Sequence, residues 1–368
     1  MRKISLLLCG LALTAPSTQA GELDQLVAAA LKDRTIPAMA VTVVRNGKVE
    51  EQSVGGVRAR GSAARASLDD AWHIGSDAKA MTATLIARLV ENGTLSWATP
   101  LKQMLPLEGM RAEYADVTLA DLLSHRAGLP PNSDEKRIEA TRSDPRPLPA
   151  LRLEYAQRAL SEAPVGAIRT EARYSNSGYL IAAAIAERAT GQDFESLLRQ
   201  QVFQPLGMQV DTSTARRGQL LGHKAGKPLS GARSDIPPFF APAGATIRLT
   251  MRDWATFAID QMAGEAGKGK LLSAEGYRYL HSVQGESGSA LGWGVKTNWP
   301  AHAPIRLLMH AGSNGYWNAL VALAPDLQGG VLVAANAGEG SGAEQQQMQI
   351  VMRLMAGFAK PDQAKAAP

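Results

Sequence analysis

The order of apolar and polar residues predicts a chain whose two ends form strands. Residues 22–32 place apolar side chains at helical spacing, whereas residues 38–45 alternate and are rich in valine. Asn46 and Gly47 then form a strong hairpin turn signal, after which residues 49–54 are predicted to return as a second strand. The chain therefore opens with a helix and an antiparallel pair of strands.

From about Ser76 the pattern becomes helical. The apolar spacing predicts helices over residues 77–91, 118–125, 151–161, 180–190, 194–202, 251–262 and 274–283. Residues 130–149 and 222–242 are rich in proline, glycine or charge and are predicted to be loops. Strand-like runs follow at residues 291–299, 305–309, 316–323 and 331–336, and a closing helix covers residues 345–358.

Strands at both chain ends with helices between them predict an α/β protein of the α+β type. We expect one antiparallel sheet flanked by helices, with an all-α lobe inserted into it. A length of 368 residues suits two lobes better than one core. We assign residues 21–75 and 247–360 to the sheet lobe, residues 76–246 to the mainly helical lobe and residues 361–368 to a tail.

The first twenty residues have the pattern of a secretory signal peptide. Arg2 and Lys3 precede an apolar stretch over residues 4–15, and residues 18–20 form a small-residue cleavage site. The apolar stretch is too short to span a bilayer as a stable helix. We therefore expect a periplasmic or secreted protein with no stable membrane span after cleavage. Cys9 leaves lipidation of the N-terminus open, although Leu8 before it does not fit a lipoprotein cleavage site.

Composition excludes several other classes of function. Cleavage removes the single cysteine and two positive charges, so the net charge falls from +5 to +3 and no disulfide or thiol chemistry remains. No basic run of the kind that binds nucleic acid is present. The six histidines have no metal-ligand spacing, and no phosphate-binding glycine loop opens a helix. We expect no metal, no cofactor and no nucleic-acid partner, and the oligomeric state is left open.

The first candidate for chemistry is the Ser-x-x-Lys pattern formed by Ser76 and Lys79. Residues three apart share one face of a helix, so the lysine can lie beside the serine hydroxyl. A desolvated lysine can be neutral and accept the proton that activates the serine. Ser133 and Lys136 repeat the pattern, but only the first copy precedes an apolar helix. An ordinary helix start with a solvated lysine is the structural alternative.

Two further patterns could complete a hydrolase site. Tyr174 and Asn176 form Tyr-x-Asn, in which the phenol can relay a proton and the amide can hold a substrate amide or ester. His310-Ala311-Gly312-Ser313 follows a strand-like run, and the Ser313 amide could pair with the Ser76 amide as an oxyanion hole. His310 would supply a partly charged donor to the substrate. The structural alternatives are a packed loop tyrosine and a surface histidine.

Taken in order, these segments resemble the serine β-lactamase-related superfamily. The similarity is greatest to its class C-like branch, which includes D-alanyl-D-alanine carboxypeptidases, D-aminopeptidases and esterases. It covers about residues 25–355 and rests on several segments of the printed sequence: residues 73–79, 122–129, 174–179, 205–208, 242–244 and 291–294. The resemblance implies a β-lactamase/transpeptidase-like fold with its site in a cleft between the two lobes, and no cofactor.

The resemblance also implies a role for each site residue. Ser76 would form the acyl-enzyme, Lys79 and Tyr174 would share the proton transfers, and either could be the resting base. Asn176, His310, Gly312 and the Ser313 amide would contact the substrate. His310 and Ala311 stand where class C β-lactamases carry Lys-Thr, which weakens the grip on a β-lactam carboxylate.

The sequence therefore predicts an exported serine hydrolase that acts on a small-molecule or peptide substrate. An ester and a D-amino-acid peptide are both open as the natural substrate. A β-lactamase with weak penicillin hydrolysis and a non-catalytic binding protein with the same fold are the alternatives, and the presence of Ser76, Lys79 and Tyr174 together argues against the second.

Overall fold

The computed structural model describes residues 21–32, 35–210, 220–229, 235–286, 288–297 and 305–358. The predicted signal peptide and the tail at residues 361–368 lie outside the described residues. Within the described ranges, no helix combines the length and the apolar character needed to cross a bilayer.

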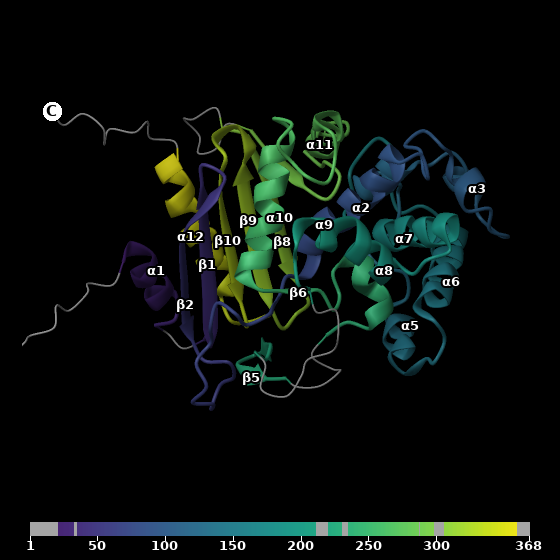
Figure 1. Ribbon diagram of the computed structural model, residues 1–368. Helices are drawn as coiled ribbons and strands as arrows, with labels where there is room; N and C mark the ends of the chain where they lie inside the picture. The colour runs from purple at the N-terminus through teal and green to yellow at the C-terminus, as the bar shows by residue number, and fades with distance from the viewer. Residues whose placement is uncertain are drawn as a thin grey trace, which may run out of the picture.

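A six-stranded antiparallel sheet is built from both ends of the chain, in the order β2-β1-β10-β9-β8-β7 (Figure 1). The strands are β1 (Ala38–Arg45), β2 (Lys48–Gly56), β7 (Gly294–Lys296), β8 (Leu307–Ser313), β9 (Asn318–Ala324) and β10 (Gly329–Ala335). β1 and β10, which come from opposite ends of the chain, pair with Val41 opposite Val333. The predicted antiparallel sheet flanked by helices is therefore confirmed.

Strand alternation decides which helices cover each face of the sheet. Met39 and Val41 pack with α1 (Glu22–Ala30) and α12 (Ala343–Phe358). Ala40 points to the other face, where it joins the core that contains α10 (Met251–Gly264) and α11 (Ala274–His281). Since successive side chains of a strand point to opposite faces, β1 needs apolar residues at almost every position, as observed.

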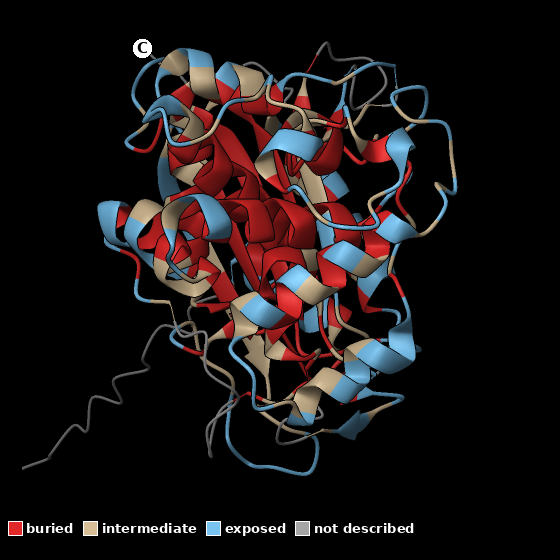
Figure 2. Ribbon diagram, turned by 90° about the vertical axis from the view of Figure 1, so that its right-hand side faces the viewer, coloured by how far each residue is buried: buried red, intermediate tan, exposed pale blue. Residues whose placement is uncertain are grey.

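The helical part of the chain gathers to one side of the sheet, on the right in Figure 1. Its centre is α7 (Asn176–Thr190), which is buried from Ser177 through Glu187. Figure 2 faces this end of the molecule and shows buried ribbon in the middle with exposed helix faces around it. The surrounding helices are α2 (Lys79–Glu91), α3 (Leu101–Met104), α4 (Leu119–Leu123), α5 (Glu135–Ala140), α6 (Leu148–Ser161), α8 (Phe194–Leu198) and α9 (Gln204–Leu206). The exact division into two lobes stays a prediction.

Both segments predicted as loops contain regular structure. Residues 130–149 include α5, which is capped by Asp134, whose carboxylate accepts a hydrogen bond from the Arg137 amide. Residues 222–242 include the hairpin of β4 (His223–Lys224) and β5 (Lys227–Pro228), and the start of the 3₁₀ helix η6 (Pro238–Ala243). The sequence did not predict α5 or the β4–β5 hairpin. The helix α5 buries no residue and the hairpin strands are two residues long, so neither element produces an apolar period in the sequence.

A buried arginine joins four elements of the helical region. Arg152 on α6 forms ion pairs with Glu187 on α7 and Glu195 on α8, and its Nε donates to the Phe239 carbonyl of η6 at 2.8 Å. The Arg152 side chain is fully buried and Glu187 is 7% exposed. The charge is therefore compensated by groups from three separate segments.

We expect Arg152→Ala to lower the free energy of unfolding by about 3–5 kcal/mol, because it leaves the Glu187 carboxylate buried without its partner. The control is Arg137→Ala, which breaks an exposed pair with Glu154 and should change stability far less. Urea denaturation of both variants measures the difference. Equal effects would contradict the interpretation.

Candidate active site

Ser76 lies in a tight turn between a strand and a buried helix. It belongs to the 3₁₀ helix η1 (Gly75–Ala78), which follows β3 (Trp72–His73) and leads directly into α2. Gly75 has a φ of +54°, a conformation that L side chains rarely adopt. The strand-to-helix turn therefore places the serine at the beginning of an apolar helix, as predicted.

The backbone of this turn touches two other segments at distances that only glycine permits. A Cβ on Gly312 of β8 would lie 1.9 Å from the Ile74 carbonyl oxygen. A Cβ on Gly244, at the end of η6, would lie 2.3 Å from the Gly75 carbonyl oxygen. These contacts give a physical reason for the glycines of His310-Ala311-Gly312 and Pro242-Ala243-Gly244, and they bring both segments against Ser76.

Lys79 is completely buried and reaches the serine. Its Nζ donates to Ser76 Oγ at 3.0 Å and to the Ala243 carbonyl oxygen at 2.6 Å. Burial lowers the pKa of Lys79 well below its usual range, and the charge of Asp77 opposes this shift only in part. A lysine in this environment can be neutral near pH 7 and can then accept a proton from the Ser76 hydroxyl.

Tyr174 contacts the same oxygen from the other side. Its hydroxyl donates to Ser76 Oγ at 2.7 Å, and Lys79 Nζ lies 5.0 Å from the centroid of its ring. The side chain as a whole is 45% exposed, while the packing around the phenol raises its pKa to about 12. The ordinary value near 10 leads to the same conclusion, which is that the phenol is un-ionised at neutral pH. The lowered pKa of Lys79 and the raised pKa of Tyr174 favour Lys79 as the resting base.

Asp77 is buried beside this group, and neither of its carboxylate oxygens forms a hydrogen bond with the part of the chain that the structure describes. Burial raises the pKa of Asp77 well above its usual range, although Lys79 lowers it in part. The shifts of Asp77 and Lys79 therefore favour two neutral groups over a buried ion pair.

Asn176 is the first residue of α7, and the loop before α5 holds its side chain. Its Nδ2 donates to the Asn132 Oδ1 at 2.9 Å, and its backbone amide donates to the Pro131 carbonyl at 2.9 Å. Ser175 caps the helix and also donates to the Pro130 carbonyl. The amide side chain is thus fixed at the helix start, two residues after Tyr174.

His310 differs from the partly charged donor that the sequence suggests. Its Nδ1 lies 2.8 Å from the Gly292 carbonyl oxygen, which can only accept, so Nδ1 carries the proton. Burial and the neighbouring Lys79 lower the pKa of the half-buried ring to about 4. At neutral pH the ring is therefore uncharged, and Nε2 presents a lone pair that can accept a hydrogen bond.

Ser313 ends β8 at the turn into β9. Its hydroxyl donates to the Trp317 carbonyl at 2.9 Å, so the side chain is engaged in the turn. A Cβ on Gly75 would lie 2.6 Å from the Ser313 nitrogen, which places the Ser313 amide against the nucleophile turn. Its role as an oxyanion donor stays a prediction.

The duplicate motifs are not assembled in the same way. Ser133 is buried and donates to Glu162, while Lys136 is exposed on α5. Asn318, which ends a second Tyr-x-Asn sequence at residues 316–318, donates to the Ala337 carbonyl within the sheet region.

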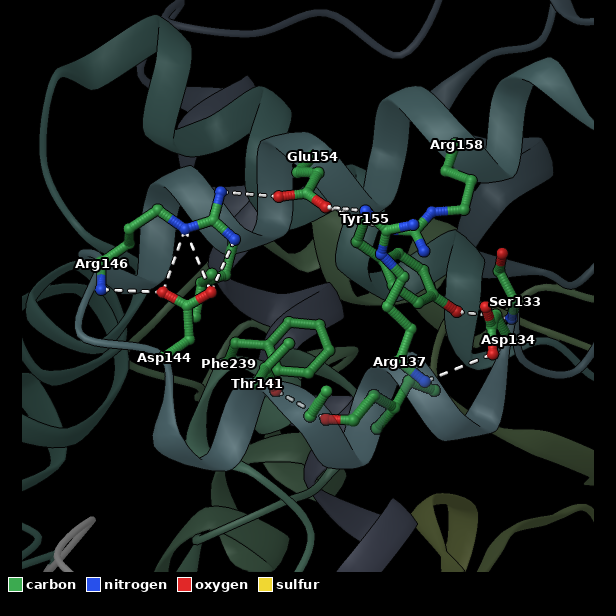
Figure 3. A pocket seen from close by; sticks show the side chains of 13 residues that line it. Ser133, Asp134, Arg137, Thr141, Asp144, Arg146, Glu154, Tyr155, Arg158 and Phe239 are labelled. Atoms are coloured by element: carbon green, nitrogen blue, oxygen red, sulfur yellow. Dashed lines mark hydrogen bonds and ion pairs between the residues drawn. The ribbon is translucent and has the colours of Figure 1, made fainter.

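A hollow of about 200 Å³ between α5 and α6 is lined by charged side chains, but neither Ser76 nor Lys79 lines it (Figure 3). Arg146 pairs with Asp144 and Glu154, and Glu154 also pairs with Arg137. These cations are neutralised within the hollow, so it has no excess charge to attract an anionic group.

Sequence reasoning missed two histidines of this region. His125 is buried with its ring centroid 4.6 Å from that of Tyr174, and its Nδ1 accepts from the Ser175 amide at 3.1 Å. His73 is fully buried, three residues before Ser76, and contacts Asp235. The proximity of His73 to the nucleophile was a signal in the sequence, whereas Asp235 lies in a segment predicted to be a loop.

Comparison with known proteins gives consistent similarities. The sequence model of the Beta-lactamase family matches residues 23–351. The chain is 26% identical to the "Beta-lactamase" of Pseudomonas fluorescens, covering 85% of this chain and 92% of that protein. It is 31% identical to "Penicillin-binding protein 4" of Amycolatopsis lactamdurans over 47% of this chain and 44% of that protein.

Among solved structures, the octameric penicillin-binding protein homologue from Pyrococcus abyssi superposes with a TM-score of 0.75 at 20% identity. The match covers 91% of this chain and 77% of that chain, and it supports the fold alone. The chain spans 33–53% of the length of three curated relatives that it matches.

We expect Gly312→Ala to lower the melting temperature and to displace the turn, because its Cβ would overlap the Ile74 carbonyl oxygen. Gly357→Ala is the control, since a Cβ there meets nothing within 4 Å and alanine favours the helix. Thermal denaturation compares the two. A Gly312→Ala protein as stable as the control would show that β8 does not press against the turn as described.

Proposed function

Because the chain belongs to the Beta-lactamase family, we propose that it is a serine hydrolase whose Ser76 forms an acyl-enzyme with an ester or a D-amino-acid peptide. The observation that carries this proposal is the contact of two groups, the Lys79 amine and the Tyr174 hydroxyl, with the Ser76 hydroxyl oxygen. Ser76 Oγ lies 3.0 Å from Lys79 Nζ and 2.7 Å from the Tyr174 hydroxyl. This arrangement joins a nucleophile, a base and a proton donor.

In acylation, neutral Lys79 takes the Ser76 proton while Oγ attacks the substrate carbonyl carbon. The resulting oxyanion would accept hydrogen bonds from the Ser76 and Ser313 amides. When the intermediate collapses, the bond to the leaving group breaks and the leaving group receives the proton, directly from Lys79 or through the Tyr174 hydroxyl. Attack by water with the same base then releases the acid product and restores the Ser76 hydroxyl.

The neutral state of His310 supports a substrate without a carboxylate at this position, such as an ester, more than a β-lactam or a peptide with a free C-terminal carboxylate. A carboxylate needs a donor or a cation, and the Nε2 lone pair of His310 offers neither. Weak β-lactamase activity is the second candidate, supported by the similarity over 92% of the Pseudomonas fluorescens "Beta-lactamase". We further propose export to the periplasm or the medium, supported by the signal-peptide pattern of residues 1–20.

Ser76→Ala is expected to lose hydrolysis of a p-nitrophenyl ester by about 10³-fold or more, because Ser76 supplies the one hydroxyl that hydrogen-bonds to Lys79 among the described residues. Ser133→Ala, from the duplicate motif, is the control that should retain activity. Steady-state kinetics with both variants measures this. Full activity in Ser76→Ala would exclude the proposed nucleophile.

Adducts mapped by peptide mass spectrometry extend the test to the substrate class. A fluorophosphonate is expected to label Ser76 in the wild-type protein. Labelling of Ser76 by a fluorescent penicillin as well would favour peptide-like substrates, and labelling by the fluorophosphonate alone would favour an ester. Stoichiometric labelling without turnover of any ester would favour a binding protein.

The activity is expected to fall as the pH is lowered, because Lys79 accepts the Ser76 proton only when it is neutral. A lysine is neutral above its pKa, and burial has lowered that pKa, so kcat/KM should be highest on the alkaline side of the lowered pKa and lost on its acidic side. The pH profile of ester hydrolysis measures this limb. A rise in activity on acidification would show that protonated Lys79 is the active form.

Lys79→Arg tests the same assignment, since arginine stays protonated at every accessible pH. We expect kcat/KM to fall by about 10²–10⁴-fold. Lys136→Arg is the matched control from the exposed duplicate motif and should leave the profile unchanged.

A further inference from the structure

The buried carboxylate of Asp235 lies behind the turn that carries Ser76. We refer to His73, Asp235, Arg248 and Asn314 as the Asp235 cluster. Asp235 is 4% exposed and its carboxylate is held from several directions. Oδ1 accepts from His73 Nε2 at 2.9 Å and from the Ile236 amide at 2.8 Å, and Oδ2 accepts from Arg248 Nη2 at 2.9 Å and from the Thr246 amide at 3.1 Å.

This carboxylate is ionised and its position is fixed. Burial by itself would raise the pKa of Asp235, but the contacts with His73 and Arg248 outweigh it and lower the pKa to about 2. β3 pairs with β6 (Arg248–Leu249) so that His73 stands opposite Arg248. The strand pairing therefore delivers both partners to the same carboxylate.

His73 connects the fixed carboxylate of Asp235 to the turn that carries Ser76. Its Nδ1 accepts a hydrogen bond from the Gly75 amide at 3.0 Å. A backbone amide can only donate, so Nδ1 is unprotonated and Nε2–H donates to Asp235. The lone pair on His73 Nδ1 is thus occupied by the amide of Gly75, the residue before Ser76. Although the chain has a serine, a histidine and an aspartate here, His73 is not the base of a Ser-His-Asp triad.

Asn314 connects the same carboxylate to the other side of the site. Its Nδ2 lies 3.4 Å from Asp235 Oδ1, and its Oδ1 accepts from the amides of Tyr316 and Trp317 at 3.0 and 3.2 Å. Asn314 follows Ser313 directly. One carboxylate therefore contacts Asn314, which follows Ser313, and also contacts His73, whose ring binds the amide of Gly75 before Ser76.

We propose that the Asp235 cluster positions the oxyanion hole by fixing the distance between the Ser76 amide and the Ser313 amide. The proposal rests on the proposed function, because it assigns His73 and Asp235 a role only if Ser76 attacks a carbonyl. An oxyanion hole works through donors held in place before charge develops, and small displacements weaken it. His73 and Asp235 act through the two amides and do not touch the substrate.

The experiment compares His73→Ala with a matched control. His281 is 1% exposed and lies in a similar buried group, with Nδ1 at 2.7 Å from Glu265 and Nε2 at 3.2 Å from Gln261. Each variant is assayed for ester hydrolysis and for the affinity of a boronic acid, whose tetrahedral adduct with Ser76 places an oxygen in the oxyanion hole. Both values are expressed per active site, from complete titration with a fluorophosphonate, and the melting temperature is recorded.

We expect His73→Ala to lower kcat and boronic acid affinity by about 10- to 100-fold while KM changes little, since the cluster acts on the transition state. His73→Gln should restore much of both, because its amide can accept from Gly75 and donate to Asp235. His281→Ala should lower the melting temperature and leave both values unchanged.

The proposal is overturned if His73→Ala loses stability as His281→Ala does, yet keeps kcat and boronic acid affinity per active site. If His73→Ala does not fold, Asn314→Ala at the half-buried turn gives the same test and should lower kcat by several fold. Failure of the proposed function is distinguishable, because Ser76→Ala would then retain wild-type activity whatever the cluster variants do.

Discussion

The rest of the site depends on the contact between the backbone of the Ser76 turn and the backbone of β8. Gly312 touches the Ile74 carbonyl oxygen and Gly75 touches the Ser313 nitrogen so closely that no side chain fits between them. Gly244 approaches the same turn from η6, and its neighbour Ala243 accepts the hydrogen bond of Lys79. Three segments that are far apart in sequence thus meet around Ser76. A side chain in place of any of these glycines would push the neighbouring backbone away.

Burial of Lys79 is the second physical condition of the site. A charged lysine at a fully buried position is costly, so the protein favours its neutral form, which is the form a general base requires. Burial is also the largest cause that lowers the pKa of His125, to about 3, so this histidine is uncharged. The removal of water from this region therefore favours the uncharged forms of Lys79 and His125 together.

The architecture explains how these groups are kept in place. In the sheet, β1 pairs with β10, which comes from the opposite end of the chain. In the helical region, α7 forms the apolar centre. Ser76 lies in η1, which leads directly into α2, and Asn176 begins α7, so the serine and the amide both stand close to the starts of buried helices. The chemistry is carried by turns and helix ends, while the stability comes from the packed elements behind them.

The sequence by itself determined the elements with a clear apolar period and the three motifs. The hairpin at Asn46-Gly47, the alternation of β1 and the helix after Ser76 follow from local rules that need no partner, and the fold class follows from their order. Ser76, Lys79 and Tyr174 were predicted because helical spacing and residue chemistry limit what such patterns can do. Local patterns could not show α5, the β4–β5 hairpin or the protonation state of His310. These features depend on helix caps, ion pairs and neighbours that are distant in sequence. The partners of His73 also arise only in the tertiary structure, because Asp235, Arg248 and Asn314 lie more than 160 residues away. The type of each residue is local information, whereas its protonation and its partners depend on which segments exclude water from it, and only the folded chain decides that.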